Sequence, residues 1–348
     1  MKTTATRLER LTERVRLAVL AVRSWWRQRR SGESGPQSTS EGSMEPMTSE
    51  QRRSVLGSFL DRYENGSALL PDPDALPYDP VPSIHTAVWH LPFVDQMVTG
   101  ELREITNLLN QWKGALRRWN AWNEVSNGLP EEVRWGIEWE FIEPLAFMCM
   151  FQPSAARDRF TFVSTNALHQ IRLAVDPKTS DELLGDAKPP KYRKSYPSRK
   201  QKEEQVEAMA GASPAGTTFV AALRALDDDD YAKVTSDFRN RASHAIAPRF
   251  SVGITSVVSR ERVQRTELQK QPDGTYKDVL VPNMTMVQYG YGGTPALRMD
   301  DAWSTNLAQF EIAKRCFFAY VDLLREMTAS MPQSLQPMLR SLAFAPSV

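Results

Sequence analysis

The sequence predicts an all-α fold, a helical bundle with a β-hairpin inserted before the last long helix. Apolar residues recur every three or four positions over long stretches, which is typical of amphipathic helices. After Pro248 the pattern becomes extended, in two stretches that flank the turn signal QPDG. The chain of 348 residues is 41% apolar and 24% charged, as globular proteins are, and its net charge of +1 gives no global preference for nucleic acid or membrane.

By composition the chain divides into residues 1–48 and 49–348. The first part combines a basic segment with a tract of disordered-linker composition, Ser31–Ser43. Two interpretations stay open. Either the natural chain starts at Met44 or Met47, so that the segment is not part of it, or the basic part forms an amphipathic helix on a membrane surface. Its short apolar run is not followed by a small-residue cleavage site, so we do not expect a secretory signal.

No segment reaches the apolar length that a membrane-spanning helix needs, so we expect no integral membrane association. Cys149 and Cys316 both stand in apolar, helix-patterned surroundings. This context predicts two buried thiols rather than a disulfide. Because free thiols are typical of a reducing compartment, the expected localisation is cytoplasmic.

Residues 49–348 form the predicted helical domain, in which a proline-rich connector, Leu69–Ser83, separates the first helix from the rest. The aromatic and aliphatic stripes of the helices predict a core rather than a cofactor site. The expected helices are Ser49–Tyr63 behind a serine cap, Leu91–Val125, a helix from Pro130 to a kink at Pro144, a helix that follows Pro153, Thr217–Asp227, a helix after Asp227–Asp230, and Ala302–Met327.

Two segments depart from the helical pattern. Residues 177–214 are predicted as a basic loop, and residues 251–292 as the β-hairpin insert. In the basic loop, Lys191, Arg193 and Lys194 alternate with two tyrosines. Such a tract can follow a phosphate backbone and stack bases, so these three residues are candidate RNA contacts. A solvated surface loop explains the same composition.

The four consecutive aspartates Asp227–Asp230 stand where the next helix begins. Carboxylates are favoured at a helix N-terminus, so we interpret them as capping residues rather than as a metal site. His85, His90 and His169 show no liganding pattern with carboxylates, and no glycine-rich phosphate loop stands out. The sequence therefore predicts neither a metal nor a cofactor.

The helix after these aspartates contains DFRNRASH, in which Arg239 is followed by Asn240 and, five positions on, by His244. On a continuous helix, Asp237, Asn240 and His244 lie along one face. The adjacent inward stripe would be Val234, Phe238, Ala242 and Ala245. The polar residues should therefore border the core, where a site is both held in place and reachable.

An arginine, a polar residue and a histidine with this spacing, in a late helix of an all-α bundle, resemble the HEPN superfamily (higher eukaryotes and prokaryotes nucleotide-binding domain). The resemblance covers about Leu91 to Met327. Only the motif is specific to the family, whereas the rest is a match of fold class. The hairpin is an addition to the minimal bundle of the family. The resemblance implies metal-independent RNA cleavage, commonly by homodimers, in a toxin or phage-defence role that can involve a cognate antitoxin or defence partner. Other members are inactive or merely bind, so a non-catalytic module that binds RNA, nucleotide or a protein stays open.

The residue types suit RNA cleavage without a metal. Histidine takes or gives a proton near neutral pH, so His244 is the expected general acid or base. Arg239 is the expected clamp for phosphate charge, because its guanidinium is permanently charged and bidentate. Asn240 would orient the substrate or the histidine. The nucleophile would be the 2′-hydroxyl of the RNA, which leaves a cyclic phosphate.

Around the motif, Asp237 is a candidate to restrain His244, and Arg241 and Arg249 are candidate phosphate contacts. In a regular helix a step of five residues turns by about 140°, so the side chains of Arg239 and His244 diverge. Two copies that face each other across a two-fold axis would bring Arg239 of one to His244 of the other. The sequence therefore predicts a composite site at a homodimer interface, although a distorted helix end would also bring the two side chains together.

Two further interpretations stay open. In a purely structural one, Arg239 pairs with Asp237 or a neighbouring helix, and His244 caps the helix before Pro248. In the other, the protein is a peripheral membrane protein that uses Arg10–Arg30 as an anchor.

Overall fold

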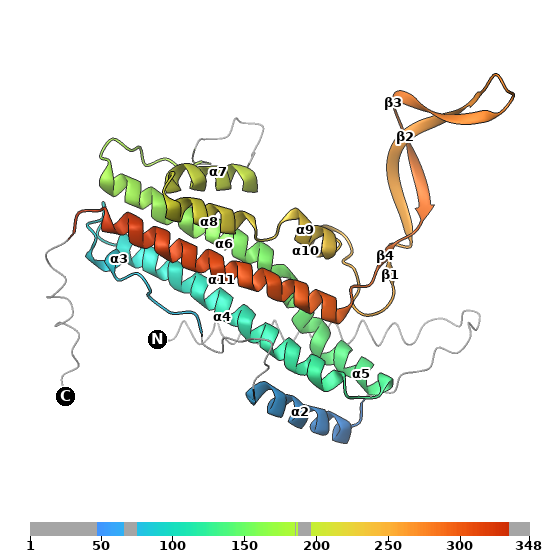
Figure 1. Ribbon diagram of the computed structural model, residues 1–348, viewed down its shortest axis with the longest axis horizontal. Helices are drawn as coiled ribbons and strands as arrows, with labels where there is room; N and C mark the ends of the chain where they lie inside the picture. The colour runs from blue at the N-terminus through green and yellow to red at the C-terminus, as the bar shows by residue number, and fades with distance from the viewer. Residues whose placement is uncertain (1–46, 66–74, 185, 187–195, 334–348) are drawn as a thin grey trace, which may run out of the picture. The chain divides into compact units, whose positions relative to one another are not determined.

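The computed structural model describes residues 47–65, 75–184, 186 and 196–333. Contacts divide the chain into two units between Pro46 and Met47, and every described residue belongs to the second unit. The predicted N-terminal segment 1–48 therefore lies outside the described residues except for its last two. The described part is mostly helical and carries one long two-stranded ribbon (Figure 1).

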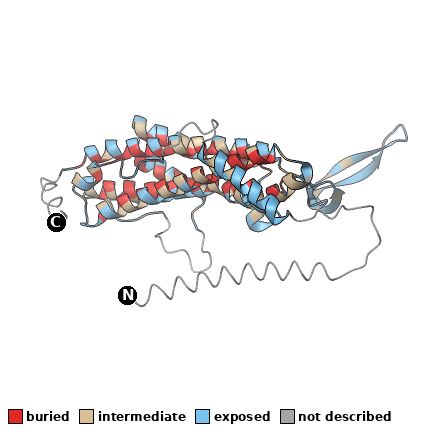
Figure 2. Ribbon diagram, turned by 90° about the horizontal axis from the view of Figure 1, so that it is seen from below, coloured by how far each residue is buried: buried red, intermediate tan, exposed pale blue. Residues whose placement is uncertain are grey.

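Three long helices form the body of the fold: α4 (Val94–Ser126), α6 (Glu143–Val175) and α11 (Met299–Ala329). Each contacts the other two, and their facing sides bury large aromatic residues such as Trp112 and Phe160. Each such side chain contributes about 1.5–3 kcal/mol when fully buried. Buried residues follow these helices along their length (Figure 2), and the predicted helical bundle is confirmed.

Shorter helices complete the fold. α2 (Ser49–Glu64) packs on α4, α7 (Arg199–Ala210) on α6, and α8 (Pro214–Arg224) on α11. α2 starts at a capping box between Thr48 and Gln51, one residue before the predicted serine cap. A π-helical turn ends at Ile142, two residues before Pro144, where the sequence predicts a kink. The short helices are α2 (Ser49–Glu64), α3 (Ser83–Thr86), α5 (Glu131–Ile137), the π-helix η1 (Glu138–Ile142), α7 (Arg199–Ala210), α8 (Pro214–Arg224), α9 (Asp229–Val234) and α10 (Phe238–His244).

α6 does not start after Pro153, as the sequence predicts, but runs through this residue. Proline lacks the N–H that would bond to the carbonyl four residues earlier, which here belongs to Cys149. Asn306 of α11 supplies the missing donor, because its Nδ2 donates to Cys149 O over 2.8 Å. Its Oδ1 accepts from Trp112 Nε1 at 2.7 Å, so the fully buried Asn306 joins α4, α6 and α11.

The predicted hairpin consists of β2 (Val258–Lys270) and β3 (Tyr276–Tyr291), paired antiparallel. The turn between them contains the QPDG signal and uses Gly274 in the left-handed region, with φ of 85°. A short pair, β1 (Ile254–Thr255) with β4 (Thr294–Pro295), lies at the base of the ribbon. Most side chains of the ribbon are exposed.

The predicted loop 177–214 is wrong for residues 199–210, which form α7. A capping box between Ser198 and Gln201 starts the helix, and its inner face buries Val206 in the core. The helical pattern of this segment is hard to recognise, because only one residue in three or four is apolar and most of the others are charged or polar.

Both cysteines are free and buried, as predicted. Burial raises the pKa of the Cys149 thiol to about 12, because a thiolate is poorly solvated among apolar side chains. Within the described ranges, no helix has the length and apolarity to span a bilayer.

Candidate functional site

The motif does not lie on a continuous helix. α9 ends at Val234, and Ser236 and Asp237 both take the left-handed conformation, with φ of 53° and 54°, before α10 begins at Phe238. Left-handed residues cannot extend a right-handed helix. The predicted inward stripe is therefore wrong at both ends. Phe238 is buried, but Val234 is 59% exposed and Ala245 is exposed as well.

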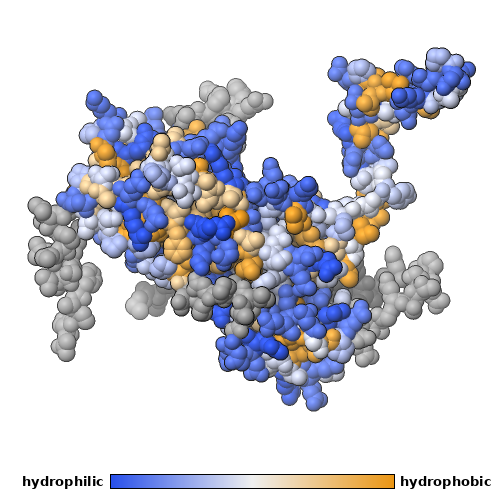
Figure 3. Space-filling model, viewed as in Figure 1, coloured by the Kyte–Doolittle hydropathy of each residue, from blue (hydrophilic) through white to orange (hydrophobic). Residues whose placement is uncertain are grey.

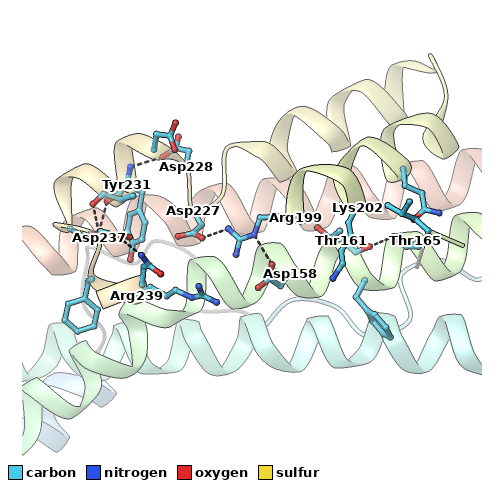
Figure 4. A pocket seen from close by; sticks show the side chains of 18 of the residues that line it. Asp158, Thr161, Thr165, Arg199, Lys202, Asp227, Asp228, Tyr231, Asp237 and Arg239 are labelled. Atoms are coloured by element: carbon cyan, nitrogen blue, oxygen red, sulfur yellow. Dashed lines mark hydrogen bonds and ion pairs between the residues drawn. The ribbon is translucent and has the colours of Figure 1, made fainter. Parts of the chain in front are cut away.

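A cleft of about 780 Å³ lies beside this break, lined by residues of α6, α7, α9 and α10 and of the turns between them. Six carboxylate side chains against three cations make the cleft acidic. Its charged lining residues are Asp158, Asp186, Asp227, Asp228, Asp229, Asp237, Arg199, Lys202 and Arg239, most of which Figure 4 labels.

Arg199 of α7 organises one wall of the cleft. Its Nε lies 3.0 Å from Asp158 Oδ1, and its Nη1 lies 2.7 Å from Asp227 Oδ2. Its Nη2 also donates to Ser154 Oγ over 2.7 Å. Figure 4 shows Arg199 between the two carboxylates, so its charge is already neutralised within the protein.

Behind this wall, Arg157 of α6 forms a buried pair with Glu203 of α7. Two hydrogen bonds of 2.7 and 2.9 Å join the guanidinium to the carboxylate, and Nη1 also donates to the carbonyl oxygens of Leu226 and Asp227. The Arg157 and Glu203 side chains are 13% and 5% exposed. The pair therefore fixes α7 and the turn after α8 on α6.

One residue of the aspartate run caps the next helix, as predicted. Asp228 is the N-cap of α9, and its carboxylate accepts from Tyr231 N at 2.9 Å. Asp227 instead pairs with Arg199. Among the described side chains, no group of three or more histidines, cysteines and carboxylates is arranged to hold a metal ion.

Arg239 and Asn240 both line the cleft. Asn240 Nδ2 donates to Asp237 Oδ2 over 2.9 Å, so Asp237 holds Asn240 rather than His244 or Arg239. Arg239 is half-buried, and no described residue forms an ion pair or hydrogen bond with its side chain. Its guanidinium is thus available to a ligand, unlike that of Arg199.

His244 is the last residue of α10, exposed, and does not line the cleft. No described residue bonds to its ring. By contrast, His169 lies 2.8 Å from Asp181, and His85 approaches a carboxylate at 3.6 Å. Within one copy, Arg239 therefore lines the cleft, whereas His244 lies outside it.

The remaining predicted contacts lie elsewhere. Arg241 donates to Thr294 Oγ1 of β4, which ties α10 to the base of the ribbon. Arg249 packs against Gly253, where an added Cβ would stand 3.2 Å from Arg249 Cδ. Neither arginine lines the cleft. The predicted RNA contacts Lys191, Arg193 and Lys194 fall outside the described residues.

Comparison with known proteins does not identify the chain. No protein-family model matches it, and neither a curated protein nor a solved structure is significantly similar to it. The sequence reasoning missed Arg199 and Asp158 as site residues, because they are 41 positions apart and no local pattern links them.

Proposed function

We propose that this protein is a metal-independent endoribonuclease of the HEPN type, which acts in the cytoplasm as a homodimer. The proposal rests on the side chains of Arg239 and His244, which are accessible and, among the described residues, unpaired. Both belong to the seven-residue helix α10, both are accessible, and no described residue binds either side chain. The structural alternative pairs Arg239 with Asp237 or a neighbouring helix, but Asp237 bonds to Asn240 instead, and no described residue pairs with Arg239.

The placement of the two side chains supports a site made by two copies. Arg239 lines the cleft, and His244 lies outside it. A single phosphate cannot easily meet both groups of one copy. In a two-fold dimer, each phosphate would lie between Arg239 of one copy and His244 of the other, giving two equivalent sites.

In the proposed reaction, the neutral His244 ring takes the proton of the RNA 2′-hydroxyl. The oxygen attacks the adjacent phosphorus, the bond from phosphorus to the 5′-oxygen breaks, and the leaving oxygen takes a proton from solvent water, to which His244 returns the proton that it gained. Arg239 stabilises the charge that develops on the phosphate oxygens. Asn240, held by Asp237, orients the substrate beside Arg239. The products are a 2′,3′-cyclic phosphate and a 5′-hydroxyl. The toxin or phage-defence setting, with a cognate antitoxin or defence partner, follows from the motif's resemblance alone.

The test is cleavage of a mixed RNA pool in EDTA by the wild type, Arg239→Ala and His244→Ala. We expect losses of about 10²–10³-fold for Arg239→Ala and about 10²–10⁴-fold for His244→Ala. Arg172→Ala and His90→Ala are matched controls, because both residues are exposed, no described residue pairs with either side chain, and neither lines the cleft. Equal cleavage by all five proteins would refute the assigned roles.

A second candidate is a non-catalytic HEPN module that binds RNA, nucleotide or a protein partner. The charge of the cleft favours its protein-binding form, because six carboxylates against three cations suit a basic protein segment better than a phosphate. Arg199 is paired and adds no available positive charge. This candidate predicts that the wild type leaves RNA intact under every condition in which it is folded and dimeric.

A further inference from the structure

The β-ribbon carries a surface that the proposed cleavage site does not use. In the half next to its base, residues 258–264 of β2 pair with residues 285–291 of β3. Directly opposed residues share a face of a ribbon, and so do residues two apart on one strand. Arg260 lies opposite Tyr289, and Arg262 lies opposite Val287. Tyr291, opposite Val258, extends the same face.

Charge is segregated between the two faces of this half. Its charged residues are Arg260, Glu261 and Arg262. The alternation puts both arginines on one face and Glu261, opposite Gln288, on the other. We call the face formed by Val258, Arg260, Arg262, Val287, Tyr289 and Tyr291 the basic-aromatic face.

The side chains of the basic-aromatic face are open to solvent. Tyr291 is 94% and Tyr289 67% exposed, and both arginines are exposed too. No described residue forms an ion pair with either arginine. Figure 3 shows apolar patches surrounded by polar surface along the ribbon. Two tyrosine rings and two unpaired guanidinium groups therefore stand together without an internal partner.

We propose that the basic-aromatic face binds single-stranded RNA, a role that rests on the proposed function because it supplies substrate to that site. Guanidinium groups pair with phosphates, and unstacked bases stack on exposed aromatic rings. Charge complementarity favours RNA over a protein surface, since the face has two cations and no carboxylate. Exposed rings favour a single strand, because bases in a duplex are already stacked.

The connection of the ribbon to α10 fits this role. Arg241 of α10 bonds to Thr294 at the ribbon base, and Thr255 Oγ1 donates to the carbonyl of Ala247, three residues after His244. The base of the ribbon is thus fixed to the segment that follows the motif. RNA bound to the ribbon is therefore held by an element that is anchored beside the end of α10 that carries His244.

The test is RNA affinity, measured by fluorescence anisotropy with an unstructured oligonucleotide of about 20 nucleotides. All proteins carry His244→Ala, so that the RNA stays intact. We expect Arg260→Gln with Arg262→Gln to weaken binding by about 10-fold or more, and to lower the slope of log affinity against log salt by about 1.4. Replacing both tyrosines by serine should also cost about 10-fold or more.

The charge-matched control is Lys270→Gln with Lys277→Gln, which removes two cations of the ribbon outside the basic-aromatic face. This control should bind RNA nearly as well as its parent. Equal weakening by the control, or unchanged affinity after the paired arginine substitutions, would overturn the proposal. So would a loss of dimer mass in light scattering without a change in RNA affinity, because the face would then bind a second copy.

The two proposals fail in different ways. If His244→Ala protein binds RNA through the basic-aromatic face but wild-type protein cleaves nothing, the nuclease proposal falls and the binding face stands. If the wild type cleaves RNA and the face variants bind and cleave equally well, the binding face alone falls.

Discussion

The substitution Asn306→Leu should destabilise the fold because it removes two buried hydrogen bonds. Leucine keeps the branching and the number of heavy atoms of asparagine but lacks the acceptor for Trp112 Nε1 and the donor to Cys149 O. Both partners are buried, and leaving each unsatisfied costs about 1–3 kcal/mol, so the expected loss is about 2–6 kcal/mol. The assay is urea unfolding followed by circular dichroism.

A second substitution, at Pro153, measures how much of this loss in stability comes from the missing N–H of the proline. With Pro153→Ala, α6 regains an N–H that can bond to Cys149 O, so one of the two unsatisfied groups disappears. In a double-mutant cycle, Pro153→Ala should therefore recover about 1–3 kcal/mol in the Asn306→Leu background. A cost of Asn306→Leu below about 1 kcal/mol, or strictly additive effects, would refute this account of how α6 passes Pro153.

Three further predictions concern stability and access. Glu203→Ala leaves the charge of Arg157 buried without its partner and should cost about 3–5 kcal/mol in urea unfolding; a loss as small as that of a surface pair would contradict the buried pair. Because burial raises the pKa of Cys149 to about 12, this thiol stays protonated near pH 8, and a thiol reagent should modify Cys149 and Cys316 only after denaturant is added. Rapid labelling of folded protein would contradict this. Replacing residues 258–291 by a short turn should leave the urea midpoint of the bundle unchanged, since the ribbon buries little, and a clear drop would show that it supports the core.

The long helices and the ribbon could be predicted because their signals are local. A repeat of three and four residues marks α4 and α11, and the QPDG turn between two extended stretches marks the hairpin. The path of α6 through Pro153 could not be predicted. Its supporting donor, Asn306, lies 157 positions from the carbonyl that it satisfies, so no local pattern reveals it.

For the candidate site, the motif itself could be found from the sequence, but its surroundings could not. The break at Ser236 and Asp237 depends on two left-handed residues that are not glycine, which local propensity does not favour. The acidic cleft depends on ion pairs such as Arg199 with Asp227, which join residues 28 positions apart. The break in the helix and these ion pairs together determine which residues of the motif line the cleft.

The most direct test of the central claim is to mix Arg239→Ala protein with His244→Ala protein. Each should be inactive alone. A mixed dimer would contain one intact site, with Arg239 from one copy and His244 from the other. After free exchange about half of the dimers are mixed, each with one of its two sites, so RNA cleavage should return to about a quarter of the wild-type rate. If exchanged dimers form and the mixture stays inactive, a site shared between two copies is ruled out.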